Sequence, residues 1–253
     1  YVVKELKDNC KIILKILNSK FMLFDIVKKA ITKCLPNFAV QKLKKLLHKR
    51  SKYEAPKTGQ DLGVYWDKKM AEVLETWGEN NVWKEIQLLI VNCSGKVLDI
   101  ACGTGKTMQN VSKFPIDVHG CDISDFLINK GLERGISKDR LTLCDATNMP
   151  YKNNSFDYAY SIGSLEHFTE IGITEFVTEC HRVTSKISYH MIPVSRSGND
   201  EGWIKTYQSF HNNLVGWWID KYKTAYNKVY VLDSIWEDSI SVGKWFVYVK
   251  DKH

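Results

Sequence analysis

The stretch VLDIACGTG, residues 97–105, is an apolar run that ends in a turn containing Gly103 and Gly105. The run has the character of a buried strand, and the residues after the turn have helical spacing. Glycines allow the backbone to adopt positive φ and to approach a ligand closely. Open α/β sheets bind ligands at the carboxyl ends of their strands, so this stretch predicts a ligand-binding turn.

Short apolar runs and helical stretches alternate from this turn onward. We expect strands at 97–100, 117–121, 141–144, 156–161 and 187–194, with helices at 105–113, 124–134, 172–183 and 211–226. Two later runs, 229–235 and 244–249, are joined by a short loop with Gly243 and predict an antiparallel pair. The fold class is therefore α/β, with a doubly wound, seven-stranded, mostly parallel sheet that ends in an antiparallel pair.

The N-terminal part of the chain differs from the rest in charge. Residues 1–50 contain 13 Lys+Arg and 3 Asp+Glu, against 36 and 29 in the whole chain, which leaves 23 and 26 elsewhere. Helical spacing of apolar residues there, and the polar stretch 51–61, predict a basic helical arm and linker over 1–60, followed by one domain over 61–253. The mildly acidic body disfavours a nucleic-acid partner. The arm suits either packing on the body or a second subunit, or an anionic membrane surface.

The seven cysteines include no CxxC pair, which favours a reduced intracellular protein and predicts no metal site. No apolar stretch reaches the ~18 residues of a spanning helix, and the N-terminus lacks the layout of a signal peptide. We therefore expect a cytoplasmic protein.

Three kinds of nucleotide site compete for the glycine turn. A phosphate-binding P-loop requires a glycine five residues before Gly105, where Ile100 stands instead. A dinucleotide fingerprint fits Gly103 and Gly105 but has Met108 at its third glycine position. Asp99, just before the turn, disfavours a pyrophosphate and suits an ammonium group. A nucleoside that carries an amino acid and no phosphate, as S-adenosylmethionine does, satisfies this third interpretation.

Four further motifs follow in order: CDIS (121–124), CDATNMPY (144–151), FDYAYSIGSLEHF (156–168) and HRVTSK (181–186). Together with the glycine turn, they make residues 65–189 resemble the class I, Rossmann-like S-adenosylmethionine-dependent methyltransferases that act on small molecules. The resemblance implies S-adenosylmethionine as cofactor and a segment of about 195–227 inserted on the acceptor side.

The resemblance also implies which residues bind the cofactor. Asp122 would hold the ribose hydroxyls, for which two carboxylate oxygens are a good bidentate match, and Asp145 would contact the adenine amino group, although an acid at a strand end is also a common helix cap. The aromatic pair Tyr65 and Trp66 would cover the sulfonium, unless it packs in the core. The full expected set is Tyr65, Trp66, Asp99, Ala101, Cys102, Gly103, Thr104, Gly105, Asp122, Ile123, Asp145, Ala146, Thr147, Ser161 and Ile162.

Methyl transfer needs alignment of the reactants and exclusion of water more than covalent help. A base is useful where the nucleophile is protonated, and His167 is the first candidate because its ordinary pKa suits neutral pH. Glu166 is the second candidate. The alternative is that His167 only holds its loop in place. For the acceptor pocket the sequence suggests His211, Asn212 and Trp203, which would suit a polar metabolite such as a sugar or sugar nucleotide.

Two other functions compete with a small-molecule methyltransferase. One is a non-catalytic regulatory domain that binds S-adenosylmethionine, and the other is an NAD-dependent oxidoreductase. The sequence has SIGSLEH where amino-methylating nucleic-acid enzymes carry a [DN]PP[YFW] motif, which argues further against DNA or RNA bases as acceptors.

Overall fold

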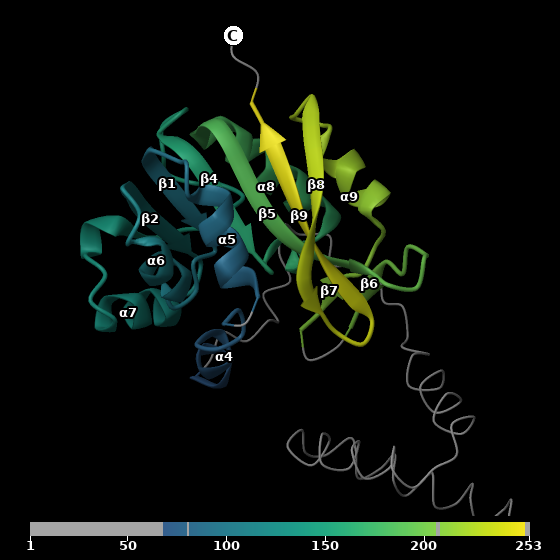
Figure 1. Ribbon diagram of the computed structural model, residues 1–253, viewed down its shortest axis with the longest axis horizontal. Coiled ribbons are helices and arrows are strands. Elements are labelled where there is room, and N and C mark those ends of the chain that lie inside the picture. Colours follow the sequence, from purple (N-terminus) through teal and green to yellow (C-terminus); the bar gives the residue numbers. More distant parts are fainter. Residues whose placement is uncertain (1–67, 80, 206–207, 251–253) are drawn as a thin grey trace, which may run out of the picture. The chain divides into compact units, whose positions relative to one another are not determined.

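The computed structural model describes residues 68–79, 81–205 and 208–250 (Figure 1). The basic arm over 1–60, Tyr65 and Trp66 lie outside these residues, so the roles expected of them stay predictions. Within the described residues, none of the helices combines the length and the apolar character needed to cross a bilayer.

A seven-stranded sheet forms the centre of the domain, in the order β3-β2-β1-β4-β5-β9-β8. Its strands are β1 (Gly95–Ile100), β2 (Ile116–Asp122), β3 (Leu141–Leu143), β4 (Phe156–Ile162), β5 (Thr184–Ser195), β8 (Lys228–Glu237) and β9 (Ser241–Val249). The strands β1 to β5 pair in parallel, and β9 runs antiparallel to both β5 and β8. The predicted fold class is confirmed.

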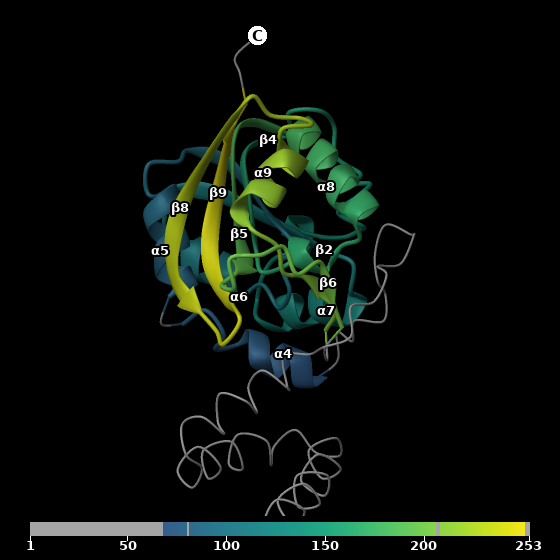
Figure 2. The same ribbon diagram turned by 90° about the vertical axis from the view of Figure 1, so that its right-hand side faces the viewer.

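Helices cover both faces of the sheet. Those on one face are α5 (Val82–Ile90), α6 (Lys106–Val111) and α7 (Asp125–Glu133), and those on the other are α8 (Glu170–Val183) and α9 (Val215–Tyr222). Figure 2 shows α8 and α9 together on the side of the sheet opposite α5. The short helix α4 (Lys68–Leu74) precedes α5.

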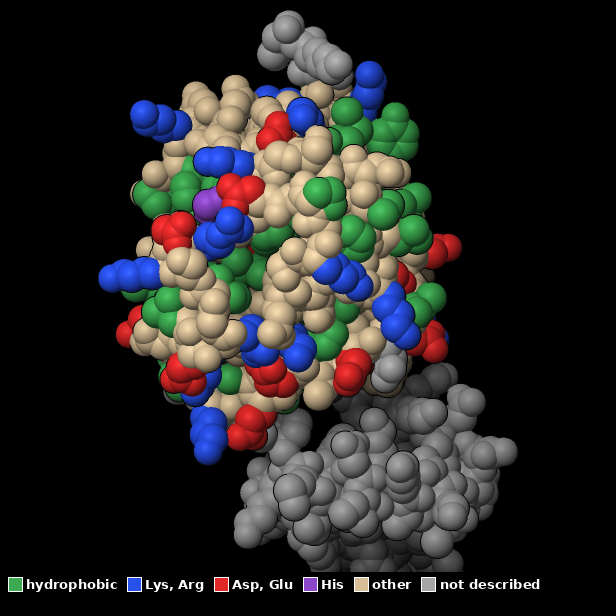
Figure 3. All heavy atoms as spheres, turned by 60° about the vertical axis from the view of Figure 1, so that its left-hand side comes forward, with side chains coloured by type: hydrophobic (Ala, Val, Ile, Leu, Met, Phe, Trp, Pro, Cys, Tyr) green, Lys and Arg blue, Asp and Glu red, His purple; other side chains and the backbone are tan. Residues whose placement is uncertain are grey.

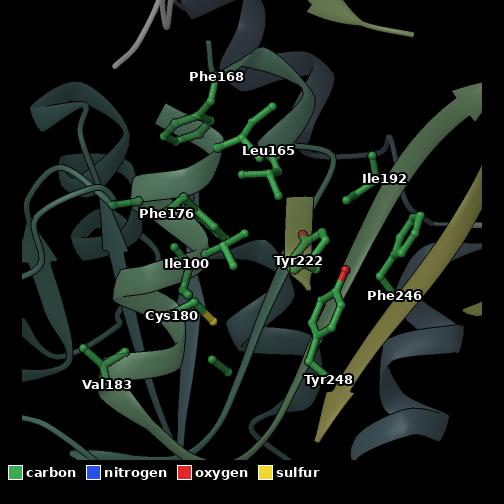
Figure 4. Close-up of a cluster of buried hydrophobic side chains, with 14 of the residues drawn as sticks. Ile100, Leu165, Phe168, Phe176, Cys180, Val183, Ile192, Tyr222, Phe246 and Tyr248 are labelled. Carbon is green, nitrogen blue, oxygen red and sulfur yellow. The ribbon is translucent and has the colours of Figure 1, made fainter. Parts of the chain in front are cut away.

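Alternation along the strands divides the core into two clusters. In β1, Leu98 and Ile100 pack toward α8 and α9, whereas Val97 packs toward α5 and α6. Successive strand residues point to opposite faces of a sheet, so both faces must be apolar when both are covered. Figure 4 shows the first cluster, in which Phe176 and Cys180 of α8 lie on the same side as Tyr222 and Tyr248.

The structure differs from the sequence prediction near residues 195–227. The sequence predicted a helix over 211–226, but the helix α9 covers only 215–222. At the start of the predicted range, residues 210–211 instead form the strand β7 (Phe210–His211), which pairs with β6 (Trp203–Ile204). Turns follow α4, and α5 starts at Val82 with Asn81 as its N-cap. Gly243 lies within β9, and the turn before it is held by Asp238, which accepts the backbone N–H groups of Ile240 and Ser241.

Candidate functional site

The turn after β1 has an unusual backbone. Gly103 (φ 56°) and Gly105 (φ 72°) are both left-handed, which confirms the conformation expected of these glycines, and Ala101 is left-handed too (φ 59°). Left-handed backbone is unfavourable for a residue with a Cβ. The turn is held by backbone hydrogen bonds from Cys102 N–H to the Cys121 carbonyl (2.9 Å) and from Gly105 N–H to the Cys102 carbonyl (3.0 Å).

Asp122 ends β2 beside this turn and holds its shape. Its carboxylate accepts the N–H groups of Gly103 (2.9 Å) and Ser124 (2.9 Å), one on each oxygen. Burial raises the pKa of Asp122, and these backbone N–H groups oppose the rise. Each oxygen retains acceptor capacity for a further donor, such as a hydroxyl.

Asp99 is also buried, with 3% of its surface exposed, but its Oδ2 atom has no hydrogen-bond partner among the residues that the structure describes. Burial raises the pKa of Asp99 well above its usual range, the nearby Tyr160 hydroxyl opposes the rise, and the charge of Asp122 adds to it. Buried carboxylate oxygens are normally paired. An unpaired one at a cleft therefore indicates the place of a donor on a ligand.

These two acids lie on one cleft, which we call the first cleft, with about 560 Å³ of space including its mouth. It is lined by Leu74, Trp77, Trp83, Asp99, Ala101, Cys102, Gly103, Thr104, Lys106, Thr107, Asp122, Ile162, Gly163 and Ser164. Lys106 is the one basic side chain in this lining, and its Nζ lies 5.9 Å from the centre of the Trp83 ring. Two buried acids disfavour a pyrophosphate and favour a cationic ligand. The cleft thus fits S-adenosylmethionine, which carries an ammonium and a sulfonium, better than NAD.

Six of the expected cofactor residues that the structure describes lie outside this lining, namely Gly105, Ile123, Asp145, Ala146, Thr147 and Ser161. Asp145 uses Oδ1 to accept both the N–H and the hydroxyl of Thr147 (each 2.8 Å), so it caps a turn and not a helix, which was the alternative considered above. Ala146 packs in the core cluster on the α8 side, and Ile123 is half-buried. The roles of these residues toward adenine stay predictions.

Ser161 also points away from the first cleft. Its hydroxyl is fully buried and hydrogen-bonds to Nδ1 of His190 (2.8 Å). Ile162, the next residue, does line the cleft. This division follows from strand alternation, since neighbouring residues of β4 face opposite sides of the sheet.

A second cleft adjoins the first. It has about 940 Å³ of space including its mouth and is lined by Val73, Leu74, Trp77, Ile162, Gly163, Glu166, His167, Pro193, Gln208, Phe210, Trp236, Asp238 and Ser241. The two clefts share Leu74, Trp77, Ile162 and Gly163. Gly163 is left-handed (φ 61°), and a Cβ there would come within 3.3 Å of the Trp77 ring and 3.6 Å of Glu166 Oε1. A larger side chain at position 163 would fill space between the two clefts, and glycine leaves that space open.

Both predicted catalytic residues lie in the second cleft. His167 Nδ1 is 2.8 Å from the carbonyl oxygen of Ser209, which only accepts, so Nδ1 carries the proton and neutral His167 has its lone pair on Nε2. Nε2 is 3.7 Å from Glu166 Oε1. Glu166 is 4% exposed, and its Oε2 has no hydrogen-bond partner in the described part of the chain. Burial raises the pKa of Glu166, and a charged His167 would lower it.

The residues expected to bind the acceptor lie elsewhere. Trp203, His211 and Asn212 are buried and line neither cleft. The His211 ring is surrounded by Trp203, Trp217 and Trp218 at centroid distances of 4.7, 5.0 and 6.4 Å. Asn212 donates to the Ile240 carbonyl and accepts from Ser241. These side chains hold the β6-β7 hairpin on the body, and their role in acceptor binding stays a prediction that neither cleft supports.

Sequence reasoning missed the residues that cover the junction. Leu74 is the last residue of α4 and Trp77 lies in the turn after it, and Glu75 between them accepts from Thr104 Oγ1 (2.9 Å) and pairs with Arg134. Arg134 also donates from Nε to the Thr104 carbonyl (3.0 Å), so α4 is tied to the glycine turn. The apolar spacing of Leu74 and Trp77 was visible in the sequence, but it indicated only a buried helix face.

Trp236 reaches the second cleft from the far end of the sequence. The irregularity between Asp233 and Glu237 in β8 is held by Glu85 of α5, which accepts from Ser234 Oγ and from the N–H of Ile235 (2.7 Å each). Ser234 Oγ in turn accepts the N–H of Trp236 (3.1 Å). The Trp236 ring lies 5.7 Å from the Trp77 ring.

Comparison with known proteins finds methyltransferases. Residues 97–186 match the family model described as a methyltransferase domain. The demethylmenaquinone methyltransferase of Paenarthrobacter aurescens is 27% identical over 180 residues, which are 66% of this chain and 67% of that protein. Haemonchus contortus phosphoethanolamine N-methyltransferase 2, solved with phosphomonomethylethanolamine and S-adenosylhomocysteine, aligns with a TM-score of 0.56 at 16% identity over 72% of this chain and 57% of that one.

Residues 97–186 thus resemble a methyltransferase domain, and the solved methyltransferase shares the fold of this chain. The same Haemonchus contortus enzyme has also been solved with S-adenosyl-L-methionine. The probable tRNA methyltransferase 9B of mouse is 36% identical over 73 residues, but these are 29% of this chain, which matches 15% of that protein's length. The relatives of the domain thus differ in acceptor, and the family alone does not define the acceptor here.

Proposed function

We propose that this chain transfers the methyl group of S-adenosylmethionine to a small molecule bound in the second cleft. The observation that carries the proposal is the junction at Ile162 and Gly163, where a cleft with a buried, unpaired Asp99 meets a cleft with His167 and Glu166. Methyl transfer requires two ligands in adjoining sites with one narrow connection between them, so that nucleophile, methyl group and sulfur align.

In this proposal Asp99 accepts a hydrogen bond from the ammonium group of the cofactor, and Asp122 accepts from the ribose hydroxyls. When bound, S-adenosylmethionine supplies an electrophilic methyl group. Leu74 and Trp77 exclude water from the junction, and the low polarity there strengthens the attraction between the acids and a cationic ligand. His167 Nε2, with its lone pair free, removes a proton from the acceptor.

The acceptor in this proposal is a small molecule and not a nucleic acid. The second cleft has no Lys or Arg in the lining that the structure describes, so it offers no contact for a phosphate backbone. On the face shown in Figure 3, basic and acidic side chains are interspersed, without a continuous basic surface. A sugar nucleotide, which the sequence suggested, is disfavoured for the same reason, because its diphosphate would meet Glu166 and Asp238.

The test is calorimetry with S-adenosylhomocysteine and with NAD, followed by transfer of a labelled methyl group to a metabolite panel. We expect binding of the homocysteine, no binding of NAD, and turnover with at least one small acceptor. Binding without turnover on any acceptor would favour the non-catalytic regulatory domain. Binding of NAD alone would overturn the proposal.

A further inference from the structure

The second cleft is lined by two acidic side chains and by His167. Glu166 and Asp238 line it, and no Lys or Arg does among the residues that the structure describes. Asp238 is exposed at the mouth, where its Oδ1 accepts two backbone N–H groups. An anionic acceptor would be repelled here, and a cationic one attracted.

Glu166 is the more deeply buried of the two acids. Its side chain is 5% exposed, and Oε2 has no hydrogen-bond partner, whereas Oε1 is 3.7 Å from His167 Nε2. Leaving a buried carboxylate oxygen unpaired is costly, so a ligand that supplies an N–H donor regains that energy on binding. A charged donor gains more than a neutral one, because charge-assisted hydrogen bonds are the stronger kind.

The rest of the second cleft is apolar and aromatic. Trp77 and Trp236 lie 5.7 Å apart with their planes tilted by 42°, and Phe210 lies edge-on to the His167 ring at 6.3 Å. Indole faces attract a cation as well as an apolar surface. The lining therefore combines an aromatic wall with one buried acid, which is a binding site for a molecule with an apolar body and one positive charge.

Resting on the function proposed above, we infer that the acceptor is an amine whose ammonium group pairs with Glu166 and whose apolar body packs against Trp77 and Trp236. A protonated amine is not a nucleophile. Its ammonium group gives one proton to His167 Nε2, and the freed nitrogen lone pair forms the new N–C bond while the C–S bond breaks and sulfur keeps that electron pair. The N-methylated ammonium product carries one positive charge, and His167 returns its proton to solvent.

The experiment measures binding in the presence of saturating S-adenosylhomocysteine. Matched pairs that differ only in ammonium against hydroxyl serve as probes, such as 2-phenylethylamine with 2-phenylethanol and tryptamine with tryptophol, and UDP-glucose is the anionic probe. We expect at least one amine to bind ten-fold or more tightly than its alcohol, as a buried charged hydrogen bond implies. We expect no binding of UDP-glucose.

The variant Glu166→Gln keeps the shape of the side chain and removes its charge. It should reduce the amine-over-alcohol preference to less than about three-fold, leaving only a neutral hydrogen bond, while S-adenosylhomocysteine still binds because Glu166 does not line the first cleft. The matched control is Glu175→Gln, an exposed acid of α8 in neither cleft, which should keep the preference.

Several outcomes would overturn the inference. These are equal binding of amine and alcohol across the panel, no binding of any amine, a preference that survives Glu166→Gln, or tight binding of UDP-glucose. In each of these cases, retained binding of S-adenosylhomocysteine leaves the proposed methyl transfer standing with another acceptor class. Loss of S-adenosylhomocysteine binding in the unaltered protein would instead refute the proposed function itself.

Discussion

Asp99 and Asp122 end neighbouring strands, yet they have different partners. Asp122 accepts one hydrogen bond from the glycine turn, at Gly103, and one from the N-cap of α7, at Ser124, whereas Asp99 is buried with its Oδ2 atom unpaired among the described residues. Asp122 therefore holds the shape of the turn, and in the proposed function it also binds a ligand, whereas the unpaired oxygen of Asp99 is the one proposed to bind the ammonium group. The capacity of a buried carboxylate to bind a ligand depends on how many of its hydrogen-bond acceptor positions are left unoccupied by the protein.

The change Asp122→Ala should weaken cofactor binding by about 1–3 kcal/mol, because a ligand hydroxyl and two backbone N–H groups lose their acceptor. Calorimetry with S-adenosylhomocysteine measures the change. Asp139→Ala, an exposed acid with no contact to either cleft, is the control and should bind as the unaltered protein does. An unchanged dissociation constant in Asp122→Ala would refute the ribose role.

The change His167→Ala should lower kcat by about 10²–10⁴-fold if His167 removes a proton, which is the usual range for general base catalysis. Affinity for S-adenosylhomocysteine should change little, because His167 lines only the second cleft. Single-turnover kinetics and calorimetry separate the two quantities. Equal losses in both would mean that His167 only holds its loop through Ser209.

At the scale of elements, the end of α4 and the turn after it line both clefts. Leu74 and Trp77 lie over both clefts, and Glu75 fixes the segment to Thr104 and Arg134. The ion pair lowers the pKa of Glu75, against the effect of burial. Glu75, a polar side chain between two apolar ones, thus connects this segment to the glycine turn.

Breaking the contacts of Arg134 with Glu75 and Thr104 should weaken the binding of the cofactor. Arg134→Met takes away the partner of Glu75 and the donor to the Thr104 carbonyl, and we expect roughly 1 kcal/mol weaker binding of S-adenosylhomocysteine, discounted for the partial exposure of Glu75. The matched control is Arg140→Met, which breaks a surface pair with Asp117 (2.7 Å) away from both clefts. If both variants bind alike, α4 is not tied to cofactor binding through Arg134.

At the scale of the whole domain, the sheet separates two cores and buries polar groups between them. His190 of β5 is fully buried, with Ser161 Oγ at 2.8 Å from Nδ1 and Cys180 Sγ at 3.5 Å from Nε2. Burial lowers the pKa of His190 to about 3 and that of His211 to about 4. Both rings are therefore neutral in the folded domain at pH 7, and folding depends on their staying so.

The free energy of unfolding should fall as the pH is lowered from about 6.5 toward 4, because the unfolded chain binds protons at these histidines before the folded chain does. Each group contributes up to about 1.4 kcal/mol per pH unit in that window, and its contribution is complete above the unfolded pKa. In His190→Gln, urea unfolding at pH 7, 6 and 5 should show a shallower slope by about one proton. An unchanged slope would contradict the assignment to His190.

The sequence by itself determined the sheet, its two-sided burial, the glycine turn and the acids Asp99 and Asp122 at strand ends. These features are set by short-range patterns, because strand and helix periods and the φ preference of glycine act within a few residues. The same patterns overextended the helix before β8, because apolar spacing alone did not distinguish β7 from a helical turn.

Only the tertiary structure decided what the site contains. Trp77, Glu166 and Trp236 meet in one cleft although up to 159 positions separate them in the chain, and Trp236 is positioned by Glu85 through Ser234. His211 and Asn212, polar enough to suggest a pocket, are turned inward. A buried polar side chain needs a hydrogen-bond partner. Whether that partner is the protein itself or a ligand depends on neighbouring residues, which only the folded chain brings together.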